Sequence, residues 1–147
     1  MPIYEKRTDR DRQEDARAIL SEYWRVDVHD LPRFYQCDWQ LMRNEKTFAF
    51  AEYKWRSYTA EQIENWGGFK LKLSKWIHGA QLLEWTGIPW LFIADLVDGV
   101  YVYKLEEIVE PEQIGRFNTS RRGDKNDLEP AVLISMEEFE RLPIVRD

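Results

Sequence analysis

The fold is decided by residues 47–55, TFAFAEYKW, which are the clearest strand signal in the chain. Side chains alternate between the two faces of a strand, so Glu52 and Lys54 are expected on one face. Phe48 and Phe50 precede them on that same face. A carboxylate and an ammonium in an otherwise apolar strand are costly to bury unless they are paired or bind an ion. The strand therefore predicts a β-sheet with a candidate functional site at Glu52 and Lys54.

Residues 34–42 are predicted to form an antiparallel hairpin with this strand, joined by a three-residue turn at 44–46. That turn length places Asp38 directly opposite Glu52, whereas a change of one residue would move Asp38 to the other face. Opposed residues have Cβ atoms roughly 4.5–5.5 Å apart. Two facing carboxylates repel each other, and a hard divalent cation such as Mg²⁺ relieves that repulsion. The hairpin therefore predicts a metal site.

The remaining periodicity predicts helices and strands around this hairpin. Gly87 is expected to end the second helical region, and residues 116–130 are expected to form a polar loop. The expected elements are a helix over 11–24, a mainly helical region over 59–86 with an interruption at 66–68, strands over 90–97, 100–105 and 131–134, and a last helix from 135 to 142. This order predicts an α/β (α+β) fold, with a mixed central β-sheet flanked by helices.

Composition indicates one domain over residues 1–147, because no linker or repeat divides the chain. With 44% hydrophobic residues the chain is expected to fold alone, and its one cysteine fits a reducing compartment. No signal peptide or membrane span is expected, so the predicted location is the cytoplasm, that of the host if the gene is carried by a phage. The net charge of −6 argues against a non-specific nucleic-acid coat, yet it permits a nuclease with a local basic face.

Asp38, followed by an apolar strand that ends in Glu52-Tyr53-Lys54, resembles the signature of the PD-(D/E)XK nuclease superfamily. The chain looks most like small phage-encoded and Holliday-junction-resolvase-like members. The resemblance covers roughly residues 11–105, and it departs from the family name where Cys37 stands in the place of proline. It implies a restriction-endonuclease-like core, with residues 106–147 as a C-terminal loop, strand and helix extension.

The resemblance also implies roles for the motif residues. Asp38 and Glu52 would bind Mg²⁺ or Mn²⁺, with the backbone carbonyl of Tyr53 as a further ligand. Lys54 would position the attacking water or help to deprotonate it, and would stabilise negative charge at phosphorus. Some relatives add a glutamate from the first helix, for which the candidates are Glu22 and Glu14.

Two basic clusters are candidates for binding DNA phosphates. The first is interleaved with the aromatic residues Tyr58, Trp66 and Phe69, and consists of Arg56, Lys70, Lys72 and Lys75. Lys75 is the best candidate for a second active-site cation. The second cluster, Arg116, Arg121, Arg122 and Lys125, lies in the expected polar loop. A solvated helix face explains the first cluster equally well, and a solvated loop balanced by acidic residues is favoured for the second.

The sequence thus predicts a metal-dependent nuclease that hydrolyses DNA phosphodiester bonds and is encoded by a phage or prophage. A homodimer would let it cut two strands symmetrically, although the sequence does not require one. The alternative is a catalytically inactive nuclease fold that acts as a DNA-binding, inhibitor or virion-associated protein. An unrelated interaction domain is the third hypothesis, in which Glu52 and Lys54 would be exposed and Asp38 would lie on the opposite face.

Overall fold

A computed structural model describes residues 7–32, 37–107, 111, 113–118 and 128–143. In chain order its elements are α1 (Arg7–Trp24), β1 (Asp27–Asp30), β2 (Trp39–Arg43), β3 (Lys46–Trp55), α2 (Ala60–Asn65), β4 (Phe69–Lys72), α3 (Leu73–Thr86), β5 (Trp90–Leu96), β6 (Gly99–Leu105), β7 (Gln113–Asn118), β8 (Leu128–Ile134), the 3₁₀ helix η2 (Met136–Glu138) and β9 (Glu140–Arg141). Within these residues no helix is both long enough and apolar enough to cross a membrane.

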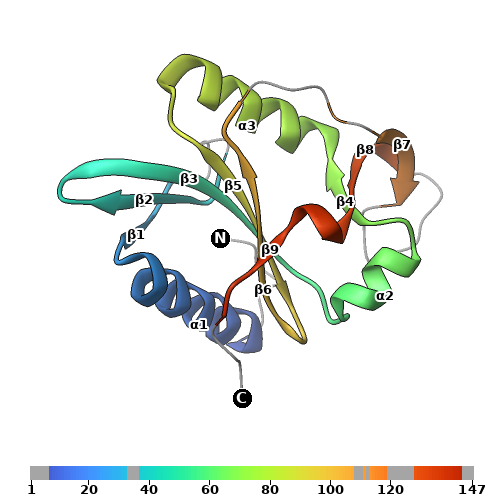
Figure 1. Cartoon of the computed structure of the whole chain (residues 1–147), viewed down its shortest axis with the longest axis horizontal. Helices are drawn as coiled ribbons and strands as arrows, with labels where there is room; N and C mark the ends of the chain where they lie inside the picture. The colour runs from blue at the N-terminus through green and yellow to red at the C-terminus, as the bar shows by residue number, and fades with distance from the viewer. Residues whose placement is uncertain (1–6, 33–36, 108–110, 112, 119–127, 144–147) are drawn as a thin grey trace.

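The main sheet has six strands in the order β1-β2-β3-β5-β6-β9. It is mixed, because β3 and β5 are parallel while the other neighbours are antiparallel. Helices α1 and α3 lie on opposite sides of this sheet (Figure 1). A second sheet of three strands has the order β4-β8-β7. The architecture is the expected α+β fold, a mixed central sheet flanked by helices.

Two hydrophobic cores lie on the two faces of the main sheet. The first packs α1 residues such as Leu20 against Ala51 and Tyr53 of β3. The second packs Trp76 of α3 against residues of β5, and Phe50 of β3 packs against it. Every residue of β5 is buried, as expected for a central strand covered on both faces. Glu52 lies on the same strand face as Phe50, so its carboxylate points into the layer between the sheet and α3.

The β2–β3 hairpin differs from the prediction at its turn but not at its site end. The turn has two residues, Asn44 and Glu45, which adopt the positive φ angles of 51° and 65° that such tight turns require. A β-bulge between Leu41 and Met42 then leaves Phe48 as the extra residue, so Phe48 packs in the α1 core and not beside Phe50. The bulge offsets the shorter turn, and the pairing beyond it is the one that a three-residue turn would have produced.

The region 59–86 contains a strand that the helical prediction missed. Phe69 and Leu71 are buried while Lys70 and Lys72 are partly exposed, and this alternation is that of β4. Gly67 and Gly68 have φ angles of 99° and 113° and turn the chain between α2 and β4. The lysines at 70 and 72 therefore stand on a strand and not on a helix.

The C-terminal segment is part of both sheets, where a loop, strand and helix extension was expected. Residues 116–118 belong to β7 and residues 128–130 belong to β8, so the loop prediction is wrong at both ends. The expected helix over 135–142 is a single 3₁₀ turn, because the chain extends again at Phe139 and pairs through β9 with β6. Ser135 caps that turn by accepting a hydrogen bond from the Glu137 backbone N–H.

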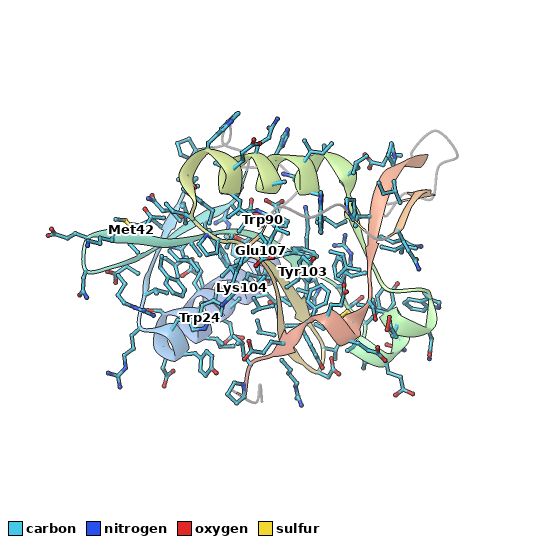
Figure 2. The ribbon with its side chains drawn as sticks, turned by 45° about the horizontal axis from the view of Figure 1, so that its top comes forward. Trp24, Met42, Trp90, Tyr103, Lys104 and Glu107 are labelled. Carbon is cyan, nitrogen blue, oxygen red and sulfur yellow. The ribbon has the colours of Figure 1, made fainter. Side chains whose placement is uncertain are left out.

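Gly79 permits the close approach of α3 to the sheet. A Cβ at this position would lie 2.4 Å from the ring of Trp90, which is fully buried beneath α3 (Figure 2). We expect Gly79→Ala to lower the free energy of unfolding by about 1–3 kcal/mol, with part of the overpacking cost offset by the higher helix propensity of alanine. Urea denaturation checks this, with the exposed α3 variant Ser74→Ala as the control. Equal stability of Gly79→Ala and the wild type would contradict the packing.

Candidate active site

Glu52 is one of two buried carboxylates among the described residues, with only 1% exposure on the central strand β3. Its Oε1 lies 3.2 Å from the Nζ of Lys75 and 4.0 Å from the Nζ of Lys54. Its Oε2 is buried and accepts no hydrogen bond from any described residue. A buried carboxylate oxygen without a partner is costly, so this atom is available for a ligand that supplies positive charge.

The environment of Glu52 makes its charge depend on pH near neutrality. The pKa of Glu52 is raised to about 7, chiefly by burial and then by the nearby Asp38 carboxylate, while Lys75 and Lys54 act in the opposite direction. Burial also lowers the pKa of the Lys54 ammonium. Near neutral pH the charge of Glu52 therefore responds strongly to any added cation.

Asp38 lies immediately before β2 and is held against β3. Its backbone N–H donates to the Ala51 carbonyl at 3.0 Å, and its Oδ2 accepts from the Tyr53 backbone N–H at 2.9 Å. The pairing of Trp39 with Ala51, continued by one residue, brings Asp38 beside Glu52. Asp38 is exposed whereas Glu52 is buried, so the two carboxylates meet where the protein interior opens to solvent.

These residues fit a divalent cation bound with several waters. The described residues contain no group of three or more histidine, cysteine or acidic side chains that could enclose a metal. A pair of carboxylates is nevertheless a sufficient protein contribution for Mg²⁺, which usually keeps several of its waters. The unpartnered Glu52 Oε2 supplies the buried oxygen that such an ion needs.

Lys75 reaches Glu52 from the first turn of α3, and of the two lysines it makes the shorter contact.

Cys37 is buried next to Asp38, and burial raises the pKa of its thiol to about 12. The Cys37 thiol is therefore protonated at neutral pH and is not a nucleophile.

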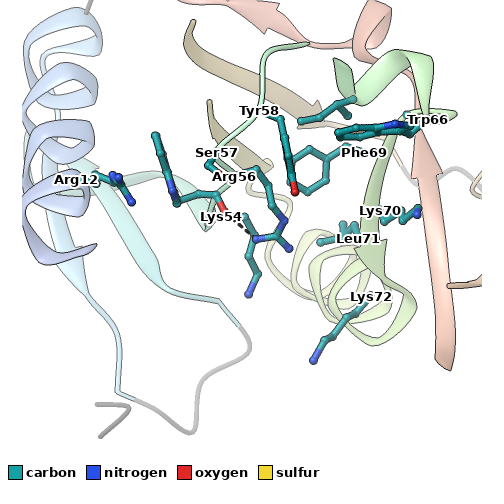
Figure 3. A pocket seen from close by; sticks show the side chains of 13 residues that line it. Arg12, Lys54, Arg56, Ser57, Tyr58, Trp66, Phe69, Lys70, Leu71 and Lys72 are labelled. Atoms are coloured by element: carbon teal, nitrogen blue, oxygen red, sulfur yellow. Dashed lines mark hydrogen bonds between the residues drawn. The ribbon is translucent and has the colours of Figure 1, made fainter. Parts of the chain in front are cut away.

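A groove of about 850 Å³ begins at Lys54 and runs between the end of β3, the turn after α2, and β4 (Figure 3). Among the described residues, its lining contains five cationic residues and no acidic residue: Arg12, Lys54, Arg56, Lys70 and Lys72. Lys72 is also 3.5 Å from Glu129. Three of the four members of the first predicted basic cluster thus share one groove, and the fourth, Lys75, contacts Glu52 directly.

The other predicted residues are not brought to this place. Helix α1 packs on the face of the sheet opposite to the Glu52 side chain. Glu14 of this helix is solvent-exposed and lies 3.9 Å from Arg17, and Glu22 is also exposed. Arg121, Arg122 and Lys125 lie outside the described residues, as does the side chain of Arg116.

Sequence reasoning missed two charged residues: Arg12, which lines the groove, and Asp95, which lies on the opposite face of the sheet from the Glu52 side chain. Arg12 lines the groove from α1, with its guanidinium carbon 4.0 Å from the ring centre of Trp55. Asp95 is fully buried on β5 and accepts a hydrogen bond from the Tyr53 hydroxyl at 2.5 Å. The signal for Asp95 was its position inside the longest apolar run, whereas nothing distinguished Arg12 from the other charges of its helix.

Residues 1–142 match the family described as "Phage putative PDDEXK endonuclease". No curated protein matches the chain. Among solved structures, the chain is similar to Hjc, a Holliday junction resolvase from the archaeal hyperthermophile Archaeoglobus fulgidus, at 14% sequence identity and a TM-score of 0.45 over 64% of this chain and 80% of that chain. Because the family match spans nearly the whole sequence, the chain belongs to the phage PDDEXK endonuclease family.

Proposed function

We propose that this protein is a Mg²⁺-dependent endonuclease of phage or prophage origin that hydrolyses DNA phosphodiester bonds. The observation that carries the proposal is the buried Glu52 carboxylate, with one oxygen unpartnered, next to Asp38 and two lysines. Family membership supports the reaction class. The cationic groove that begins at Lys54 supports a polyanionic substrate.

The chain's own residues divide the work of the proposed reaction. Asp38 and Glu52 would hold the cation, with the Tyr53 carbonyl as a further ligand. When bound, Mg²⁺ would lower the pKa of a coordinated water and offset the charge that develops at phosphorus. Lys54 stands where the groove meets Glu52, so its ammonium can hydrogen-bond a phosphate oxygen and orient the attacking water. Arg56, Lys70 and Lys72 would hold flanking phosphates.

Cleavage of a labelled DNA panel tests this function. The panel contains linear duplex, single strand, flap and four-way junction, each incubated with Mg²⁺, with Mn²⁺ or with EDTA. We expect metal-dependent cutting that is lost in Asp38→Asn, which keeps a side-chain acceptor for the Tyr53 N–H but removes the charge. Asp27→Asn, an exposed aspartate on β1, is the matched control. No cutting by folded protein would instead favour an inactive DNA-binding, inhibitor or virion-associated protein.

The acid limb of the pH–rate profile should reflect the protonation of Glu52. A protonated Glu52 cannot bind a cation, so at low Mg²⁺ concentration kcat/KM should fall as the pH drops through about 7. Lys75 lowers the pKa of Glu52, so Lys75→Met should move this limb to higher pH, by up to about one unit. Lys104→Met, at a partly exposed lysine on β6, should leave the limb in place. A limb that does not move in Lys75→Met would contradict the assignment.

A further inference from the structure

The groove beside the candidate active site ends in an exposed aromatic pair that the proposed chemistry does not use. Tyr58 is 41% exposed and Trp66 is 56% exposed, and both line the groove. Their rings meet edge-to-face, at 86° with centroids 4.8 Å apart (Figure 3). An edge-to-face pair occupies at most one face of either ring, so a face of the exposed Trp66 ring is available to a ligand.

The backbone holds Trp66 firmly at this position. Its N–H donates to the Ile63 carbonyl at 3.1 Å, and the Gly68 N–H donates to the same carbonyl at 3.1 Å. Gly68 cannot be replaced easily, since a Cβ there would lie 2.7 Å from the Ile134 carbonyl oxygen. The turn that carries Trp66 is therefore held in place between α2 and β8. A large aromatic ring that a fixed turn keeps exposed to solvent is a candidate contact for a binding partner.

The charges around this pair select the chemistry of the partner. Arg56 and Lys70 lie along the same groove, and the part of its lining that the structure describes contains no carboxylate, although the whole chain carries a net charge of −6. Aromatic faces combined with a cationic track are the features that bind single-stranded nucleic acid, in which each unpaired base offers a free π-face. Inside a duplex the base faces are covered by their neighbours, so the same rings gain little from paired DNA.

From this arrangement we infer that the groove binds unpaired nucleotides, with a base stacked on Trp66 and its phosphates on Arg56 and Lys70. The inference rests on the proposed nuclease function, because it names the substrate class of that nuclease. This class is DNA with a single-stranded segment next to the cleaved bond. The path from Trp66 along the groove to Lys54 leads such a strand toward Glu52.

Binding measured without cleavage tests the inference. Fluorescence anisotropy in EDTA and at fixed salt compares a labelled oligothymidylate of about 12 nucleotides with a duplex of similar length. We expect Trp66→Ala to weaken single-strand binding between about 5-fold and 150-fold, the range for loss of one stacked base, and to change duplex binding less than about 2-fold. Trp66→Phe, which retains a ring, should recover most of the loss.

Trp85→Ala is the matched control, because Trp85 is 70% exposed on α3 and does not line the groove. It should leave both affinities unchanged, and thermal melting should show that all variants are folded. Equal weakening of single-strand and duplex binding by Trp66→Ala, no effect of that variant, or no single-strand binding by the wild type would overturn the inference. A Trp66-dependent single-strand affinity without any cleavage would instead leave the inference standing and defeat the nuclease proposal.

Discussion

Glu52→Gln is expected to reduce metal-dependent DNA cleavage by about 10³-fold or more, since it removes the charge of the buried oxygen pair that would hold the cation. Glutamine has nearly the shape of a protonated glutamate, so the packing around Lys54 and Lys75 should persist. Steady-state cleavage of the best substrate, measured across Mg²⁺ concentrations, gives the comparison. Residual activity within about 10-fold of the wild type would place the reaction elsewhere.

The same substitution should change how stability depends on pH. In metal-free protein the pKa of Glu52 is raised from 4.5 to about 7, so between these values the folded state keeps a proton that the unfolded chain has released. The free energy of unfolding therefore falls as the pH rises through this window, by on the order of 3 kcal/mol in total. Glu52→Gln should match the wild type below the window and exceed its stability above it. Adding Mg²⁺ at about pH 8 should stabilise the wild type alone.

Lys54→Met is expected to lower kcat by about 10²–10³-fold with a much smaller change in KM, as for the loss of one preorganised electrostatic donor. Lys54 lines the groove and also lies beside Glu52, with its Nζ 4.0 Å from Glu52 Oε1. Methionine retains most of the stem's packing. Single-turnover cleavage at saturating Mg²⁺ separates the chemical step from product release.

Lys72→Met is the matched control for Lys54→Met. Lys72 lines the same groove but contacts Glu129 and not Glu52, so its loss should weaken DNA binding and flatten the salt dependence while kcat changes little. If Lys72→Met lowered kcat as strongly as Lys54→Met, the groove cations would act as a general electrostatic field and Lys54 would have no separate role.

The β2–β3 hairpin illustrates how far the sequence could predict this candidate site. The alternation of residues 47–55 put Glu52 on an inward face, and the register that brings Asp38 beside it was predicted from a turn of the wrong length. The outcome was preserved because the β-bulge adds the residue that the two-residue turn lacks. Whether a bulge forms depends on how side chains pack on the two faces of the sheet, and here that packing places Phe48 in the first core and Phe50 in the second. The local sequence does not indicate this tertiary packing.

The missed elements share a different cause. Strand β4 is only four residues long and leads directly into α3, and its alternation becomes decisive only when β8 pairs with it. Strand β9 likewise exists because β6 offers an edge to it. Arg12 reaches the groove through the tertiary docking of α1, which the composition of α1 could not indicate. Long-range pairing of this kind overrides local propensity.

A crystal soaked with Mn²⁺ would show whether Asp38 and Glu52 together bind a divalent cation. We expect an anomalous peak within coordination distance of both carboxylates, roughly 2.0–2.2 Å from their oxygens as for a hard divalent ion, with the Lys75 ammonium displaced from Glu52 Oε1. The peak should be absent in Glu52→Gln. A wild-type crystal that binds Mn²⁺ only elsewhere, or not at all while Lys75 stays paired with Glu52, would show that these two carboxylates are not a cation site.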